Sequence, residues 1–267
     1  INIYGNVTFN AITFSNAGTK TINGNITANG LMTISAGSTV EGNGTHSLYA
    51  GLRGDGTCNF SGKVIMRGGN IYVQGASNSF TLGTAELEIN GYVGITFNSP
   101  STAITLNVNN NVNIIGGYLV LNNNSYLIGQ AANTLTLASG YRLYVRGVDN
   151  FPSGFGTYNL QSGSYVRYDA IFDQQIAGGI TYGYLELYST NGAATTKTAT
   201  GNITILNNLD FLNATYPTTF DVNGYDLTLT GNITNANVST FDASDGGTVT
   251  FNNNGTQTFS LGTYRFN

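Results

Sequence analysis

Short runs in which apolar and polar residues alternate recur along the chain. Examples are residues 85–89, 103–108, 118–121, 134–137 and 141–145, and the segments between the runs are rich in Gly, Asn and Ser. Alternation with a period of two is typical of β-strands, and Gly, Asn and Ser are typical of turns. No window places apolar residues three and four positions apart with charges opposite them. The pattern therefore predicts many short strands and almost no helix.

Two internal repeats organise these strands. Residues 163–182 match residues 247–264, with Val166 aligned to Val249 and Gln174 to Gln257, each 83 residues apart. A second match relates the start of the chain to residues 182–224 through the segments Thr-Lys-Thr (19–21 and 196–198) and Gly-Asn-Ile-Thr (24–27 and 201–204). Repetition of this kind indicates a solenoid, because each repeat buries its apolar face only against its neighbours.

The fold that these observations favour is all-β, a parallel β-helix (β-solenoid) of roughly a dozen coils, with tandem β-sandwich domains as the alternative. Stacked coils place like residues above one another, so Asn runs such as 109–111 and 122–124 can pair from coil to coil, and Asn and Gly tolerate the positive φ of tight corners. We expect one solenoid over residues 1–267, a window of a longer tandem array. Repeat similarity is clear in 1–50 and 163–267 and degenerate in 51–162.

Composition narrows the functional classes. Only 8% of the residues are charged, against roughly 25% in ordinary globular domains, while Asn and Thr number 37 and 36. The net charge is -4 and no basic cluster is present, so nucleic acid is not an expected partner. No apolar stretch approaches the ~20 residues of a membrane-spanning helix. The single cysteine, Cys58, is expected to be buried, and the low charge favours an extracellular or cell-surface location.

The segments Gly-Thr-Val-Thr-Phe (247–251), Gln-Thr-Phe (257–259) and Gly-Thr-Tyr (262–264), with Thr-Lys-Thr and Gly-Asn-Ile-Thr upstream, carry a resemblance. They resemble the large repetitive, adhesin-like surface proteins of Bacteroidetes-type bacteria. More loosely, the chain is similar to autotransporter passengers and filamentous haemagglutinins. The resemblance covers residues 1–50 and 163–267, and it implies an extracellular parallel β-solenoid with a structural or adhesive role.

The most suggestive surface feature is formed by Arg142, Tyr144 and Arg146. These residues alternate with Leu143 and Val145, which should face the core. Arginine forks and an aromatic ring can hold a sugar by bidentate hydrogen bonds and stacking. The simpler interpretation, an ordinary strand face without a ligand, is the one that we favour.

Other candidates for chemistry carry weaker signals. Glu86 and Glu88 share one strand face and are expected to be the solvent side of an amphipathic strand rather than a carboxylate pair of a hydrolase. His46 is the only histidine and is expected in a solvated turn. Asp242 and Asp245 could bind calcium, although a plain Asx-turn explains them as well. We therefore expect no catalytic residue, no metal site and no cofactor.

The function that follows is a non-enzymatic extracellular protein, namely a stalk, a fibre subunit or an adhesin segment. Tyr4 and Tyr264 lie at the same phase of the repeat, which predicts end-to-end association of copies into a filament. The expected partners are a second copy or a surface glycan. The first alternative is a carbohydrate-binding module on the same scaffold, and the second, less favoured, is a polysaccharide lyase or hydrolase.

Overall fold

The protein is described by a computed structural model that covers residues 1–74, 78–96, 102–189, 194–212 and 215–267. In these residues the chain is all-β without a helix, and parallel strands stack into a β-solenoid of about 11 turns. The predicted parallel β-helix is confirmed. The alternative of tandem β-sandwiches is wrong, because sandwiches are built from antiparallel sheets. The described residues contain no apolar helix that could cross a bilayer.

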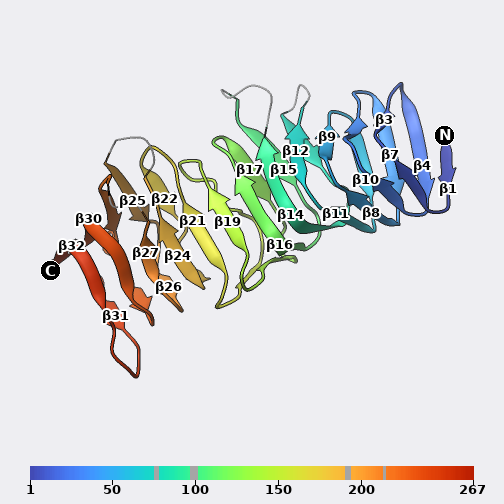
Figure 1. Cartoon of the computed structure of the whole chain (residues 1–267). Coiled ribbons are helices and arrows are strands. Elements are labelled where there is room, and N and C mark those ends of the chain that lie inside the picture. Colours follow the sequence, from blue (N-terminus) through green and yellow to red (C-terminus); the bar gives the residue numbers. More distant parts are fainter. Residues whose placement is uncertain (75–77, 97–101, 190–193, 213–214) are drawn as a thin grey trace. The chain divides into compact units, whose positions relative to one another are not determined.

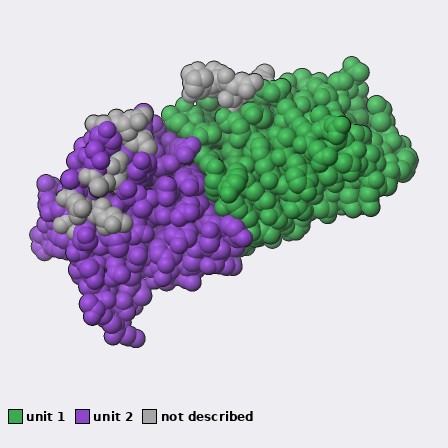
Figure 2. All heavy atoms as spheres, viewed as in Figure 1, with its two compact units in different colours: residues 1–137, 152–159 green, residues 138–151, 160–267 purple. Residues whose placement is uncertain are grey.

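The chain divides into two compact units, coloured separately in Figure 2. Unit 1 comprises Ile1–Leu137 and Pro152–Asn159, and unit 2 comprises Ala138–Phe151 and Leu160–Asn267. In each unit, one turn of the chain contributes a strand to each of three stacks. These are called the first, second and third stack, and the two Thr-Lys-Thr segments mark the first stack in both units.

In unit 1 the strands of each stack follow one another in chain order (Figure 1, blue and green). The first stack holds two hydrogen-bonded groups, β1 (Asn2–Tyr4), β4 (Gly18–Asn23), β7 (Ser38–Gly42), β10 (Thr57–Phe60), and then β13 (Ser79–Thr81), β15 (Ile104–Asn107), β17 (Ser125–Ile128). The second stack holds β2 (Val7–Phe9), β5 (Ile26–Ala28), β8 (Thr45–Leu48), β11 (Lys63–Met66), β14 (Glu86–Thr96), β16 (Val112–Leu121), β18 (Thr134–Leu137) and β20 (Thr157–Leu160). The third stack holds β3 (Ile12–Phe14), β6 (Met32–Ile34), β9 (Gly51–Gly54) and β12 (Gly69–Val73), and β14 and β16 continue into it.

Unit 2 repeats the three stacks (Figure 1, yellow to red). The third stack holds β19 (Arg142–Val145), β21 (Tyr165–Tyr168), β24 (Tyr184–Leu187), β27 (Leu209–Phe211), and the first parts of β30 (Ile233–Ala243) and β32 (Phe259–Phe266). The first stack holds β22 (Gln174–Ile176), β25 (Thr195–Ala199), β28 (Thr218–Asp221), and the last parts of β30 and β32. The second stack holds β23 (Ile180–Tyr182), β26 (Ile203–Ile205), β29 (Leu227–Leu229) and β31 (Val249–Phe251).

Inward-facing residues form columns in which each side chain lies above its counterpart one turn earlier. In unit 1 such a column runs through Ile26, His46, Val64, Leu87 and Val112, and all five are fully buried. Residues that alternate with this column along the strands, such as Thr27, Ser47 and Asn113, are partly exposed, as strand alternation requires. The predicted solvated turn for His46 is therefore wrong, because this residue occupies an inward position of β8.

Asparagine shapes the turns and ties them together. Four non-glycine residues in the described part of the chain have positive φ, and all of them are asparagines: Asn16, Asn78, Asn124 and Asn223. At other turns the amide oxygen accepts a backbone N–H of the next turn, as Asn25 does from Thr45 at 2.7 Å and Asn202 from Asp226 at 3.0 Å. The predicted positive φ of turn asparagines is confirmed. The predicted pairing between asparagines is replaced, at Asn110 and Asn111, by bonds to the Thr84 carbonyl and the Thr134 N–H of the neighbouring turns.

The repeat at 83 residues does not return to the same stack. Val166 lies on β21 in the third stack, whereas Val249 lies on β31 in the second. Gln174 and Gln257 nevertheless act alike, since each Nε2 donates to carbonyls at the end of a strand and in the turn that follows it. These are the carbonyls of Val145 and Gly147 for Gln174, and of Leu229, Thr230 and Gly231 for Gln257. The repeated element is therefore a strand with its turn, and a whole number of turns is not preserved.

Candidate functional site

The predicted Arg-Tyr feature lies on the outer face of the third stack in unit 2. Arg142 and Tyr144 alternate on β19 with Leu143 and Val145, which are fully buried. Arg146 follows the strand, and 44% of its side chain is exposed. The orientation expected from the sequence is therefore confirmed for all five residues.

Aromatic and guanidinium groups on this face stack from turn to turn. Arg142 lies opposite Tyr165, which lies opposite Tyr184. The Arg142 guanidinium sits 4.4 Å from the centroid of the Tyr165 ring, within cation–π range. The rings of Tyr165 and Tyr184 stack 4.5 Å apart with an interplanar angle of 12°. The ring faces are thus largely occupied by neighbours in the same stack.

Two buried carboxylates hold the arginines. Glu186 accepts from Arg167 Nε at 2.7 Å and from Arg142 Nη2 at 3.4 Å, and Asp169 pairs with Arg146 Nε at 3.1 Å. Burial raises the pKa of Asp169, and the charge of Arg146 opposes this shift.

The arginine heads of this face are therefore engaged by the protein's own acids. The Tyr144 ring completes the arrangement, with the guanidinium groups of Arg146 and Arg167 at 5.6 and 5.2 Å from its centroid. An anionic sugar would have to compete with Glu186 and Asp169 for the guanidinium groups. These ion pairs and ring contacts connect neighbouring turns of the solenoid. Ligand binding by Arg142, Tyr144 and Arg146 stays a prediction.

The remaining sequence candidates have structural partners. Lys63 Nζ, from the preceding turn, pairs with Glu86 at 2.8 Å and with Glu88 at 3.1 Å. Glu88 is only 8% exposed, so this strand face is drier than predicted. Asp242 accepts from the Ser244 backbone N–H at 3.1 Å, which is the Asx-turn alternative. Within the described ranges no three His, Cys, Asp or Glu residues gather as metal ligands.

Each unit contains a buried amine that was not predicted from the sequence. Lys197 is fully buried, and its Nζ donates to Gln174 Oε1 at 2.6 Å and to the carbonyls of Ala170 and Phe172 at 3.1 and 3.2 Å. Burial lowers the pKa of Lys197 to about 8. Lys20 is also buried and donates to the carbonyls of Asn16 and Gly18. Both lysines satisfy turn carbonyls from inside the solenoid.

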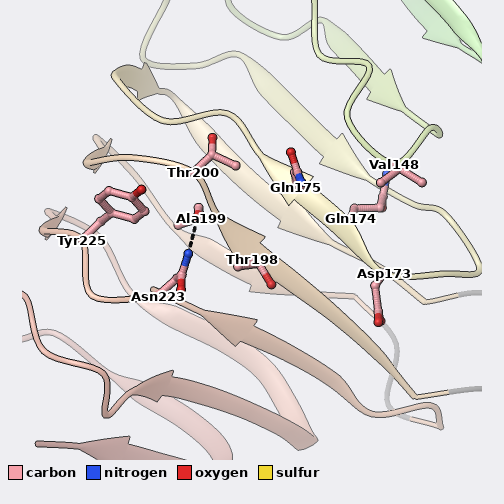
Figure 3. A pocket seen from close by; sticks show the side chains of 9 residues that line it. All are labelled: Val148, Asp173, Gln174, Gln175, Thr198, Ala199, Thr200, Asn223 and Tyr225. Atoms are coloured by element: carbon pink, nitrogen blue, oxygen red, sulfur yellow. Dashed lines mark hydrogen bonds between the residues drawn. The ribbon is translucent and has the colours of Figure 1, made fainter.

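A cavity of about 380 Å³ opens beside this buried network in unit 2 (Figure 3). Its lining comes from successive turns of the chain: Val148, Asp173, Gln174, Gln175, Thr198, Ala199, Thr200, Asn223 and Tyr225. Figure 3 shows Tyr225 at one end and Val148 at the other, with the polar side chains of Gln175 and Thr198 between them. Nothing in the sequence pattern indicated this cavity, because it depends on which turns lie side by side.

In comparisons with known proteins, no family model, curated protein or solved structure matches the chain. The repetitive β-solenoid is confirmed by the structure itself. The resemblance to adhesin-like bacterial surface proteins stays a prediction.

Proposed function

We propose that this chain is a non-catalytic, extracellular structural or adhesive segment of a bacterial surface protein, such as a stalk, a fibre subunit or part of an adhesin. The observation that carries the proposal is the outer face of the third stack in unit 2. There, side chains bond to one another along the stack, from Tyr144 through Arg167 and Glu186, and again from Asp210 to Thr234.

Such bonds suit a protein that bears load. Parallel backbone ladders already join neighbouring turns, and repeat proteins gain stability mainly from these nearest-neighbour interfaces. Ion pairs with a buried partner, such as Arg167 with Glu186, add resistance where turns would otherwise peel apart. The largely uncharged exterior, rich in Thr and Asn, fits exposure outside the cell. A second copy of the chain and a surface glycan are the partners included in this proposal.

Optical-tweezers unfolding of the full chain, tethered at both ends, tests the load-bearing role. One turn spans 23 residues between the partners Arg142 and Tyr165, so its release should add about 80 Å of extended chain. We expect stepwise lengthening in increments of this size. The Glu186→Ala variant should lower the force of the steps that come from unit 2. Smooth extension at low force without such steps would contradict the proposal, and so would turnover of a polysaccharide by the purified chain.

A further inference from the structure

We propose that the cavity over β22 and β25 in unit 2 binds a neutral sugar. This site deepens the adhesive role proposed above and rests on it. It lies on the first stack and its turn, whereas Arg142, Tyr144 and Arg146 belong to the third stack and the residue after it. At about 380 Å³ the cavity lies at the lower end of the range typical of small-molecule sites.

The cavity has free hydrogen-bonding groups aligned by strand register. Gln175 lies opposite Thr198 on the adjacent strand, so the amide and the hydroxyl sit side by side on the outer face. Among the described residues, the side chains of Gln175, Thr198 and Tyr225 make no hydrogen bond within the protein. The amide and the hydroxyls each offer both a donor and an acceptor, as sugar hydroxyls require.

Two apolar surfaces lie at the ends of the cavity, as Figure 3 shows. Tyr225 is 37% exposed and Val148 is 49% exposed. A tyrosine ring combines a broad apolar face with a polar tip, and sites for small ligands typically join apolar walls to a few converging polar groups. A pyranose has the complementary character, with C–H groups on its faces and hydroxyls around its edge.

The wall that carries Tyr225 is fixed before any ligand arrives. Asn223 has a φ of 54° and donates from Nδ2 to the Ala199 carbonyl at 3.2 Å, the bond drawn in Figure 3. The Tyr225 backbone N–H donates to the Val222 carbonyl at 3.1 Å, which closes the turn. On the opposite side, the Gln175 N–H donates to the Val148 carbonyl at 2.7 Å. A fixed wall lowers the entropy cost of binding.

Charge selects a neutral ligand. Asp173 is the one charged residue in the lining, and one of its oxygens already accepts from the Thr196 N–H at 2.7 Å. A carboxylate accepts hydrogen bonds from sugar hydroxyls but repels phosphate, sulfate and uronic acids. The ammonium of Lys197 donates to Gln174, a buried residue of the lining, and is itself fully buried, so it offers no exposed cation to an anion.

The test is binding of a panel of neutral cello-, malto-, xylo- and N-acetylchito-oligosaccharides, with oligogalacturonate as the anionic comparison, to the purified full chain. Binding is measured by saturation-transfer NMR and calorimetry. Thr198→Val and Tyr225→Ala should each weaken binding of the recognised sugar by about tenfold, the effect of losing roughly one hydrogen bond or contact. The controls are Thr196→Val, on the same strand face outside the lining, and Tyr92→Ala, an exposed tyrosine of unit 1. Circular dichroism of each variant checks that it is folded.

Binding that is lost in the two cavity variants and kept in both controls supports the site. Three results would overturn it: no neutral oligosaccharide of the panel binds at millimolar concentration, oligogalacturonate binds in preference to the neutral sugars, or binding survives both cavity variants and disappears in Arg142→Ala. If no sugar binds in the cavity but the chain still unfolds in steps under force, only this inference is wrong. Loss of the steps would remove the proposed load-bearing role.

Discussion

Burial of His46 predicts that the protein loses stability as the pH falls into the acid range. The imidazole is fully buried in the column between Ile26 and Val64, and its ring lies 4.3 Å from the ring of Phe60. Neither ring nitrogen has a hydrogen-bond partner among the described residues. A cation at this position would have neither water nor a counter-ion, so folding strongly favours the neutral form.

The magnitude follows from the shift in pKa. Burial lowers the pKa of His46 from 6.5 to about 4. Between these values the unfolded chain binds a proton that the folded chain does not bind, so the free energy of unfolding falls as the pH decreases through this window. At 1.36 kcal/mol for each pKa unit, the loss attributable to His46 is about 3 kcal/mol.

The assay is urea unfolding followed by far-ultraviolet circular dichroism, with the natural chain and the His46→Leu variant compared at a series of pH values. Leucine is apolar and does not titrate, so the contributions of all other groups cancel in the difference. We expect the variant to gain about 3 kcal/mol relative to the natural chain between pH 6.5 and pH 4. Above pH 6.5 it should be at least as stable, because two unpartnered ring nitrogens are removed from the core. Parallel stability curves for the two proteins would show that His46 does not bind a proton on unfolding in this pH window.

Three further predictions concern buried groups. Glu186→Ala should lower the free energy of unfolding by about 2 kcal/mol, because Arg142 and Arg167 both lose their carboxylate partner. Glu86→Ala, at a more exposed ion pair, should lower it by less than about 1 kcal/mol. Equal losses for the two variants in urea titrations would contradict this prediction. The pKa of Lys197 is lowered from 10.5 to about 8, so between these values the unfolded chain binds a proton that the folded chain does not bind. As the pH rises through this window, the free energy of unfolding of the natural chain should increase by about 3 kcal/mol relative to that of Lys197→Met. A difference that does not change with pH would contradict this prediction. Burial raises the pKa of the Cys58 thiol to about 12, so a thiol reagent at neutral pH should label the folded chain far more slowly than the chain in urea.

The orientation of side chains on single strands could be predicted, because it depends only on local alternation. Leu143 and Val145 point inward and Arg142 and Tyr144 outward, as the pattern requires. The partners of these residues could not be predicted. Glu186 reaches Arg142 from two turns away, and its position depends on the length of every intervening turn. Turn lengths vary along the solenoid, since 18 residues separate His46 from Val64 and 25 separate Leu87 from Val112.

The buried polar groups show where a composition-based interpretation fails. Lys20 shares its strand face with Ile22, so alternation alone places the lysine inside. A lysine is expected in solvent because burial of an ammonium is costly unless its hydrogen bonds are satisfied. Here backbone carbonyls accept hydrogen bonds from Lys20 and Lys197 inside the solenoid. These carbonyls are available to the amines because the backbone at the corners directs their oxygens inward. Giving alternation precedence over residue type would have identified both lysines and also His46.

The shift of the 83-residue repeat from one stack to another follows from the same physics. A strand in any of the three stacks meets the same demands, namely a parallel neighbour on each side, an apolar inner face and a turn whose carbonyls need donors. A sequence that meets these demands in one stack therefore meets them in another. Gln174 enters the first stack and Gln257 leads into the third, yet each amide donates to the carbonyls of a turn in the preceding coil. The element that repeats in the sequence is thus one strand with the turn whose carbonyls the glutamine binds. One coil of the solenoid consists of three such elements packed around one core.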